Sequence, residues 1–266
     1  MTQPREAPSI FSLLGEGLKR KVFEFQDYFY LSLRSVLNAF TPPYYWVDTL
    51  TQMDRIGIGS LPIIILASLS IGGVMVLNTA AQFERFGETA LTGDVVSLAL
   101  VRELGPTVAA LLIAGRNASG MASELGSMIV TEQVDAMRAL GTDPLRKLMT
   151  PRVLATFFVL PLLTAVFDFI GMVGGFIVAH FTLRLDAVQF WQRAIRALEY
   201  GDLVMGMAKP AVFALIIATV GCYQGLRVRG GTEGVGRATT TAVVVSSVFV
   251  LITDFFMTRL LLYIYR

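Results

Sequence analysis

Five charged side chains stand within long apolar stretches of the sequence: Arg102, Glu103, Asp168, Lys209 and Asp254. A charged side chain at the centre of a membrane-spanning helix costs at least about 2.5–3.5 kcal/mol, so such residues usually face a protein interior or a wet cavity. Two interpretations stay open. The residues either form ion pairs that lock helices together, or they line a cavity that opens outward and meets charged lipid headgroups or a partner protein.

Arg102 and Glu103 are neighbours in the chain, and this limits what they can do together. Successive residues of a helix point about 100° apart, so the two side chains cannot both face one lumen. We therefore expect at least one of them to lock two helices. The apolar remainder of the surrounding stretches suits acyl chains better than a polar solute.

Motifs for nucleotide binding and for catalysis are missing. Residues 115–120 hold glycines but no lysine that could reach a phosphate, and residues 230–236 do not match the dinucleotide-binding pattern. One histidine, His180, and one cysteine, Cys222, cannot supply a Ser-His-Asp triad, a zinc site or an internal disulfide. The sequence predicts no catalytic residue, no metal site and no cofactor, and this chain alone should not bind ATP as a P-loop protein.

The composition is typical of an integral membrane protein. Of 266 residues, 54% are hydrophobic and 16% are charged, and the mean hydropathy is +0.63; soluble domains carry about 25% charged residues. The net charge of +2 is too small to favour nucleic-acid binding. A membrane span needs about 20 mostly apolar residues, and five stretches qualify: 56–78, 95–115, 153–181, 203–223 and 238–262. We predict an all-α integral membrane protein that forms a single domain over residues 1–266.

The basic residues indicate the orientation. With the N-terminus in the cytoplasm, the outer side carries only Arg85, Arg184, Arg193, Arg196 and Arg266 outside the spans, and the cytoplasmic side carries far more basic residues. This bias favours a cytoplasmic N-terminus and a periplasmic C-terminus. At 1.5 Å per residue, Arg102 and Lys209 then lie roughly 10 Å below the outer surface, and Asp168 and Asp254 about 12–20 Å below it. Four helices would thus carry charges at a common depth.

Residues 10–40 predict an amphipathic helix that lies on the membrane surface. Leu13, Leu14 and Leu18 recur at helical spacing, and basic residues such as Lys19 occupy other positions. A short soluble helix that packs on the domain is the alternative. The aromatic cluster at positions 44–46 is of the type found at a membrane boundary. The polar start at residues 1–9 is not expected to be a cleavable signal peptide.

Residues 116–152 form a predicted linker between the second and third spans, on the cytoplasmic face. Its patterning indicates two short helices separated by a break, because Gly141 can end a helix and Pro144 can start the next one. Such a pair could dock into a groove on another protein, and an ordinary amphipathic connector is the alternative. The charged candidates for a docking contact are Glu124, Glu132, Asp135, Arg138 and Asp143.

Several motifs, in order along the chain, resemble those of the MlaE/YrbE permease family. The first signature run contains Arg102-Glu103-Leu104-Gly105-Pro106, Ala114-Gly115-Arg116, Glu124-Leu125-Gly126-x-Met128, Glu132-Gln133-x-Asp135-Ala136, Asp143-Pro144 and Pro151-Arg152. The second is Arg229-Gly230-Gly231-x-Glu233-Gly234-Val235-Gly236-x-Ala238-Thr239. The similarity covers nearly the whole chain from about residue 10 onward. Asn117 departs from the pattern, because the family often has a small residue there.

The resemblance implies the permease subunit of an ABC transporter of the Mla/Mce lipid-transport type. Such permeases form a homodimer in the bacterial inner membrane and bind a cytoplasmic ABC ATPase (MlaF-like) through the linker, which acts as a coupling helix. They sit beneath a ring of periplasmic MCE-domain subunits (MlaD-like), and in many members a small STAS-domain protein (MlaB-like) binds the ATPase. Phospholipid would move between the inner membrane and a periplasmic carrier, which maintains outer-membrane lipid asymmetry.

By the same resemblance, Arg102 and Glu103 would fall in the outward-facing lipid cavity, with Lys209 and Asp254 matched by their positions in the spans. Two other classes of function stay open. One is an ion-coupled secondary transporter that uses Asp168 and Asp254. The other is a membrane scaffold that anchors MCE proteins without transporting lipid.

Overall fold

Long helices make up almost all of the chain that the computed structural model describes, residues 10–184 and 186–265. Five helical segments are long and apolar enough to cross a membrane: Trp46–Glu84, Thr89–Val130, Leu145–Phe181, Tyr200–Leu226 and Gly231–Ile264. Within this part of the chain there is no β-strand, and the prediction of an all-α membrane protein with five spans is confirmed. Residues 1–9, where no signal peptide is expected, lie outside the described part.

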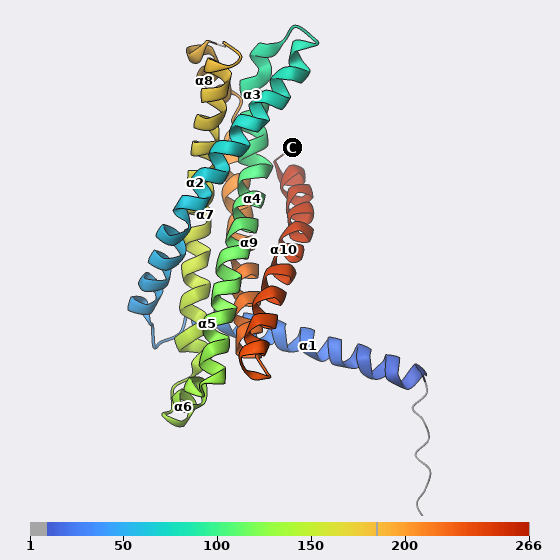
Figure 1. Ribbon diagram of the computed structural model, residues 1–266, viewed down its shortest axis with the longest axis vertical. Coiled ribbons are helices and arrows are strands. Elements are labelled where there is room, and N and C mark those ends of the chain that lie inside the picture. Colours follow the sequence, from blue (N-terminus) through green and yellow to red (C-terminus); the bar gives the residue numbers. More distant parts are fainter. Residues whose placement is uncertain (1–9, 185, 266) are drawn as a thin grey trace, which may run out of the picture.

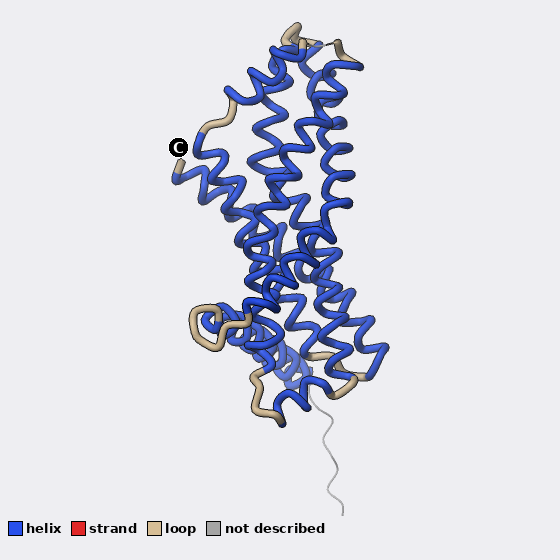
Figure 2. The backbone as a smooth tube through the Cα atoms, turned by 90° about the vertical axis from the view of Figure 1, so that its left-hand side faces the viewer, coloured by secondary structure: helices blue, strands red, loops and turns tan. Residues whose placement is uncertain are grey.

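The helices extend well beyond the apolar stretches that predicted them. They include α2 (Trp46–Glu84), α7 (Thr150–Phe181), α9 (Tyr200–Leu226) and α10 (Gly231–Ile264). At a rise of 1.5 Å, the 39 residues of α2 are about 58 Å long, whereas the hydrocarbon core of a bilayer is about 30 Å thick. The loops accordingly lie near the two ends of the bundle (Figure 2).

The second span continues far past its predicted end at residue 115. It runs through η1 (Thr89–Leu91), α3 (Thr92–Ala99), the π-helical turn η2 (Leu100–Leu104), α4 (Gly105–Ile113), a second π-helical turn η3 (Ala114–Ala118) and α5 (Ser119–Val130). The first part of the linker predicted at 116–152 is therefore a continuation of this helix, up to Val130. Met121, Ala122 and Leu125 are buried in the bundle, so their apolar face keeps the chain helical after Arg116.

A short hairpin remains between the second and third spans. It holds α6 (Gln133–Ala139), whose entry residue Glu132 has a left-handed backbone with a φ of 59°. After Gly141, at a φ of 78°, the chain turns back through the π-helical segment η4 (Leu145–Met149) into α7. In Figure 1, α6 forms the lower tip of the molecule.

Helix α1 (Ile10–Asn38) lies across the lower end of the bundle, to the side of the five spans (Figure 1). Phe23, Phe25 and Phe29 are exposed on it, and its position in the headgroup layer stays a prediction. The hydroxyl groups of Tyr28 and Thr219 are 2.8 Å apart, which ties α1 to α9. Burial raises the pKa of the Tyr28 phenol, and its hydrogen bonds oppose that shift.

The opposite end of the molecule carries α3 and α8 (Ala187–Arg196), which pack on each other. Asp186 caps α8 by accepting a hydrogen bond from the Gln189 backbone N–H at 2.8 Å. The carboxylate of Asp94 on α3 lies 3.3 Å from Arg193 on α8. Helix α10 ends well below this level (Figure 1), so the last turns of α10 are not covered by α3 and α8.

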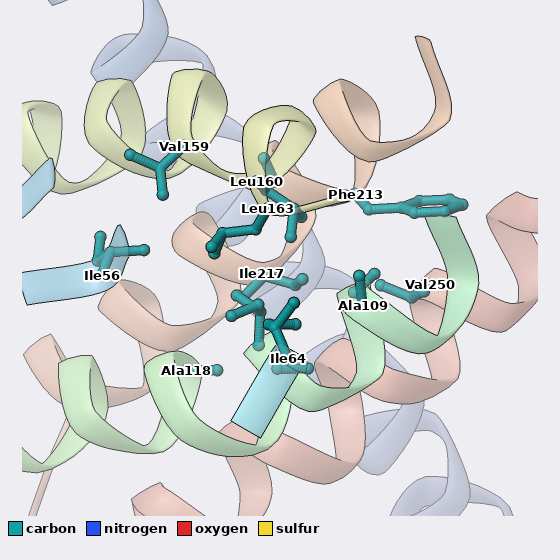
Figure 3. Close-up of a cluster of buried hydrophobic side chains, with 14 of the residues drawn as sticks. Ile56, Ile64, Ala109, Ala118, Val159, Leu160, Leu163, Phe213, Ile217 and Val250 are labelled. Carbon is teal, nitrogen blue, oxygen red and sulfur yellow. The ribbon is translucent and has the colours of Figure 1, made fainter. Parts of the chain in front are cut away.

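Small residues bring neighbouring helices into close contact. A methyl group added at Gly72 of α2 would lie 1.8 Å from the carbonyl oxygen of Gly171 on α7, and one at Gly174 would lie 2.2 Å from that of Leu69. Glycines of α2 and α7 thus allow the close approach that small residues permit between membrane-spanning helices. Gly225 of α9 faces Ala122 of α5 in the same manner. Between these contacts lies an apolar core that includes Ile64, Leu160, Phe213 and Ile217 (Figure 3).

Candidate functional site

The buried ammonium group of Lys209 joins three helical segments. Its side chain is only 1% exposed, and Nζ lies 2.7 Å from Glu103 Oε2 on η2 and 3.2 Å from Asp254 Oδ1 on α10. Nζ also donates a hydrogen bond to the backbone carbonyl of Arg102 at 2.9 Å. Thr258 Oγ1 lies 3.2 Å from both oxygens of Glu103. These four side chains, Glu103, Lys209, Asp254 and Thr258, are called the lysine lock below.

Arg102 points away from the lysine lock and pairs with a different helix. Its Nε lies 2.5 Å from Oδ1 of Asp202, whose side chain is 2% exposed. Asp202 stands in the first turn of α9 and also accepts a hydrogen bond from the Glu199 backbone N–H at 2.9 Å. A carboxylate at this end of a helix is favoured by the helix dipole. Arg102 and Glu103 thus bind to different partners, as their neighbouring positions on one helix require.

Arg102 and Glu103 both stand on the π-helical turn η2. In this turn the backbone N–H of Gly105 bonds to the carbonyl of Leu100, five residues back, and such turns occur frequently at functional sites. Asp168 of α7 packs directly on it, because a methyl group added at Gly105 would lie 1.7 Å from Asp168 Oδ1. Within the described residues that oxygen has no hydrogen-bond partner. Only glycine at position 105 leaves room for this buried carboxyl group.

A cavity of about 940 Å³ lies between the start of α9 and the end of α10. Arg102, Asp202 and Glu199 line one part of it, and Arg259 adds a second guanidinium group. The rest of the lining is apolar or aromatic: Met205, Phe256, Leu260, Leu262, Tyr263 and Tyr265, with Gly201. Guanidinium groups bind phosphate oxygens through paired N–H donors, and the apolar wall suits hydrocarbon. We call this space the charged cavity.

Only one of the five predicted charged residues lines the charged cavity. That residue is Arg102; Glu103, Lys209 and Asp254 are held in the lysine lock, and Asp168 packs separately on η2. Sequence reasoning missed Asp202 and Arg259. Asp202 stands one residue before the predicted fourth span, and Arg259 lies inside the predicted fifth span, where a complete count of charged residues finds it.

The predicted docking residues fall into two groups. Glu124 lies 3.4 Å from Arg55 of α2 and 3.0 Å from Arg152 of α7, whose side chain is 5% exposed. Asp143 lies 3.3 Å from Arg34 of α1 and caps the Leu145 backbone N–H at 3.0 Å. These two carboxylates therefore hold the molecule together.

The remaining three docking candidates are on or beside α6. Asp135 and Arg138 are exposed and pair with each other at 2.9 Å, and Glu132 is exposed at the turn before α6. Leu140, directly after the helix, is 83% exposed. This end of the hairpin is open to a partner. Across the described residues no group of three or more His, Cys, Asp and Glu side chains could hold a metal ion.

The chain is similar in sequence to known permeases. A family model described as permease MlaE matches residues 49–260. The chain is 38% identical over 230 residues to a probable ABC transporter permease protein of Rickettsia typhi, which covers 86% of this chain and 89% of that protein. It is 35% identical over 211 residues to the intermembrane phospholipid transport system permease protein MlaE of Haemophilus influenzae, covering 79% and 81%. It is also 38% identical to the chloroplastic protein trigalactosyldiacylglycerol 1 of Arabidopsis thaliana, covering 83% and 63%.

Proposed function

Because the chain belongs to the MlaE permease family, we propose that it is the membrane subunit of an ABC transporter that moves phospholipid. The observation that carries the lipid assignment is the charged cavity. Its wall joins the guanidinium groups of Arg102 and Arg259 to a larger apolar surface. A phospholipid has the matching pair of features, an anionic phosphate and hydrocarbon chains.

The partners and the location belong to the same proposal. The chain would form a homodimer in a bacterial inner membrane, with its N-terminus in the cytoplasm and its C-terminus in the periplasm. A cytoplasmic MlaF-like ATPase would bind ATP and dock on α6, with a MlaB-like STAS-domain protein on that ATPase in some systems. A ring of MlaD-like MCE subunits would exchange phospholipid with the charged cavity and so maintain outer-membrane lipid asymmetry. The position of the cavity, at the end of the bundle away from α6, supports this arrangement.

A mechanical connection between the two ends supports coupling to an ATPase. One helical segment of 42 residues runs from Thr89 to Val130 and carries η2 in one half and the approach to α6 in the other. At 1.5 Å per residue it is about 63 Å long. Movement of α6 on ATP binding would tilt this segment and displace Arg102 relative to Asp202. The charged cavity would then narrow and release its lipid, because the two conformations bind lipid with different affinity.

The test is lipid transfer by the complete complex in proteoliposomes, with Arg102→Ala and Arg259→Ala as variants and Arg85→Ala as a control. Arg85 is exposed and is not part of the charged cavity. Loss of a charge-assisted hydrogen bond costs about 1.5–3 kcal/mol, so we expect ATP-driven transfer to fall roughly tenfold or more in Arg102→Ala. Wild-type transfer in both cavity variants would refute the assignment of the cavity to lipid.

The ion-coupled and scaffold alternatives have no observation of their own in their favour. Neither Asp168 nor Asp254 lines the charged cavity, and Asp254 is held by Lys209. Transport by the purified chain alone, driven by an ion gradient without an ATPase, would establish the first alternative. Unchanged lipid transfer after the charged cavity is filled, for example by Met205→Trp, would favour the scaffold.

A further inference from the structure

A second hollow lies where α1 ends and α2 and α7 begin, at the α6 end of the bundle. It is a groove of about 540 Å³ with an almost entirely apolar wall, which includes Phe40, Leu50, Met53, Phe157 and Phe158. This volume falls within the range of about 300–1,000 Å³ that is typical of small-molecule sites. The groove is separate from the charged cavity, since no residue lines both.

A much smaller polar cleft, of about 20 Å³, opens into this groove. The two spaces are continuous, because five residues line both of them: Ala39, Tyr44, Trp46, Thr49 and Leu154. The rings of Tyr44 and Trp46 are 5.9 Å apart and stand at the junction. Aromatic side chains of this type gather at the boundary between headgroups and hydrocarbon. The groove and the cleft therefore lie where an acyl chain meets its headgroup.

The polar cleft presents hydrogen-bond donors that lack acceptors. The side chain of Arg146 donates to the Pro42 carbonyl at 2.6 Å and to Thr41 Oγ1 at 3.5 Å, which leaves other N–H groups of the guanidinium available. Arg146 has no acidic partner among the described residues. Asn38 is 8% exposed and lines the same cleft, and its Nδ2 has no hydrogen-bond partner in the described part of the chain. A buried donor without an acceptor is unfavourable unless a ligand supplies one.

We propose that this site binds one anionic phospholipid of the leaflet on which α1 rests. The phosphate would sit at the mouth of the small cleft and accept hydrogen bonds from Arg146, and one of its oxygens would enter the cleft to accept from Asn38 Nδ2. One acyl chain would fill the groove. Basic pockets between membrane-spanning helices on the cytoplasmic side are known to bind lipid headgroups. The nearby cation Lys147 pairs with Asp48 at 2.5 Å, which leaves Arg146 as the cation available to the lipid. This inference concerns binding alone and does not depend on the proposed transport.

The test is native mass spectrometry of the complete chain in detergent, titrated with phosphatidylglycerol or phosphatidylcholine in the absence of ATP. In Arg146→Gln the affinity for one phosphatidylglycerol should fall about tenfold, because a charge-assisted hydrogen bond is lost. Phosphatidylcholine should be affected less, and Asn38→Ala should weaken both lipids. The Arg146→Lys variant keeps the charge and should retain most of the binding. Arg138→Gln is the matched control, because Arg138 lies on α6 and lines neither space.

The location is tested with a phosphatidylglycerol that carries a photoreactive diazirine in its acyl chain. We expect labelling of residues 153–158, and loss of that label in Leu154→Trp while labelling of residues 256–265 persists. Equal phosphatidylglycerol affinity in Arg146→Gln and Arg138→Gln would overturn the proposal, as would labelling confined to residues 256–265. Size-exclusion chromatography identifies variants that fail to fold. If Arg146→Gln is among them, the phosphatidylglycerol affinity of Arg146→Lys tests the proposal in its place. Failure here would leave the charged cavity and its transport assay untouched.

Discussion

Lys209 illustrates how a charge can be kept inside a membrane bundle. Its ammonium group is buried, yet two carboxylates from two other helical segments and a backbone carbonyl surround it. A buried charge is expensive unless it is paired and hydrogen-bonded. The stabilisation therefore depends on all the charged groups of the lysine lock together. Removal of one of them leaves a buried charge without its partner. This makes the lysine lock a determinant of stability more than of lipid recognition.

We predict that Lys209→Met destabilises the protein by about 3 kcal/mol, because it leaves the Glu103 and Asp254 carboxylates close together without a cation. Breaking a buried ion pair typically costs about 3–5 kcal/mol, and the partial exposure of Glu103 places the effect near the lower limit. The measurement is the free energy of unfolding in mixed micelles titrated with a denaturing detergent.

The control neutralises the whole set. Replacement of an ion pair by neutral groups is often tolerated, so Lys209→Met combined with Glu103→Gln and Asp254→Asn should recover most of the lost stability. If the combined variant is as unstable as Lys209→Met, shape and not charge explains the defect.

The sequence identifies individual charged residues but not their partners. Arg102, Glu103, Lys209 and Asp254 stand out because each interrupts an apolar stretch. Which carboxylate meets which cation depends on the lateral order of the helices, and that order leaves no local pattern. Asp202 shows the limit most clearly: it looks like an ordinary residue at the start of a helix, and only the structure brings Arg102 to it at 2.5 Å.

At the scale of helices, the second span continues as a helix well past the membrane exit predicted at residue 115. Arg116 marks the predicted exit from the membrane and Glu124 lies in the predicted linker, but both bind to other helices. Arg116 donates to Ser60 on α2 at 2.9 Å. Meanwhile Ala118, Ala122 and Leu125, spaced four and three residues apart, continue a buried face. That spacing is visible in the sequence and is typical of a helix that continues beyond residue 115. The π-helical turns η2 and η3 have no comparable signal.

The glycine contact between α2 and α7 gives a prediction at the same scale. Gly72→Ala would place a methyl group 1.8 Å from the Gly171 carbonyl oxygen, so the two backbones must separate. Overpacking of this kind typically lowers the free energy of unfolding by about 1–3 kcal/mol. Because the methyl group would meet rigid backbone, we expect a loss of about 3 kcal/mol here. Thermal unfolding of the purified protein should show a lower midpoint.

Gly120 provides a matched control on α5. A methyl group added there meets nothing within 4 Å, and alanine is favoured over glycine in a helix by up to about 1 kcal/mol. Gly120→Ala should therefore leave stability unchanged or raise it slightly. A midpoint in Gly72→Ala equal to that of Gly120→Ala would show that α2 and α7 are not held as closely as described.

At the scale of the whole molecule, the sequence predicts the class of fold well. Hydropathy and helix length alone indicate five spans and an amphipathic helix before them, and the structure has all six. The charged cavity and the apolar groove could not be predicted from the sequence, because each is bounded by residues from segments that are distant in sequence. Leu215 of α9 and Leu50 of α2 line one groove, and Arg102 and Tyr265 line the charged cavity.

The two groups of carboxylates at the α6 end of the bundle should separate partner binding from stability. Asp135 lies on the exposed hairpin at the tip of the molecule, so Asp135→Arg should weaken co-purification of the proposed ATPase about tenfold by charge reversal without lowering the unfolding midpoint. Glu124→Arg should do the opposite. It leaves the buried guanidinium of Arg152 beside a like charge, which should cost about 3 kcal/mol of stability. Pull-down and thermal unfolding of both variants check this, and loss of the ATPase only in Glu124→Arg would reject α6 as the docking element.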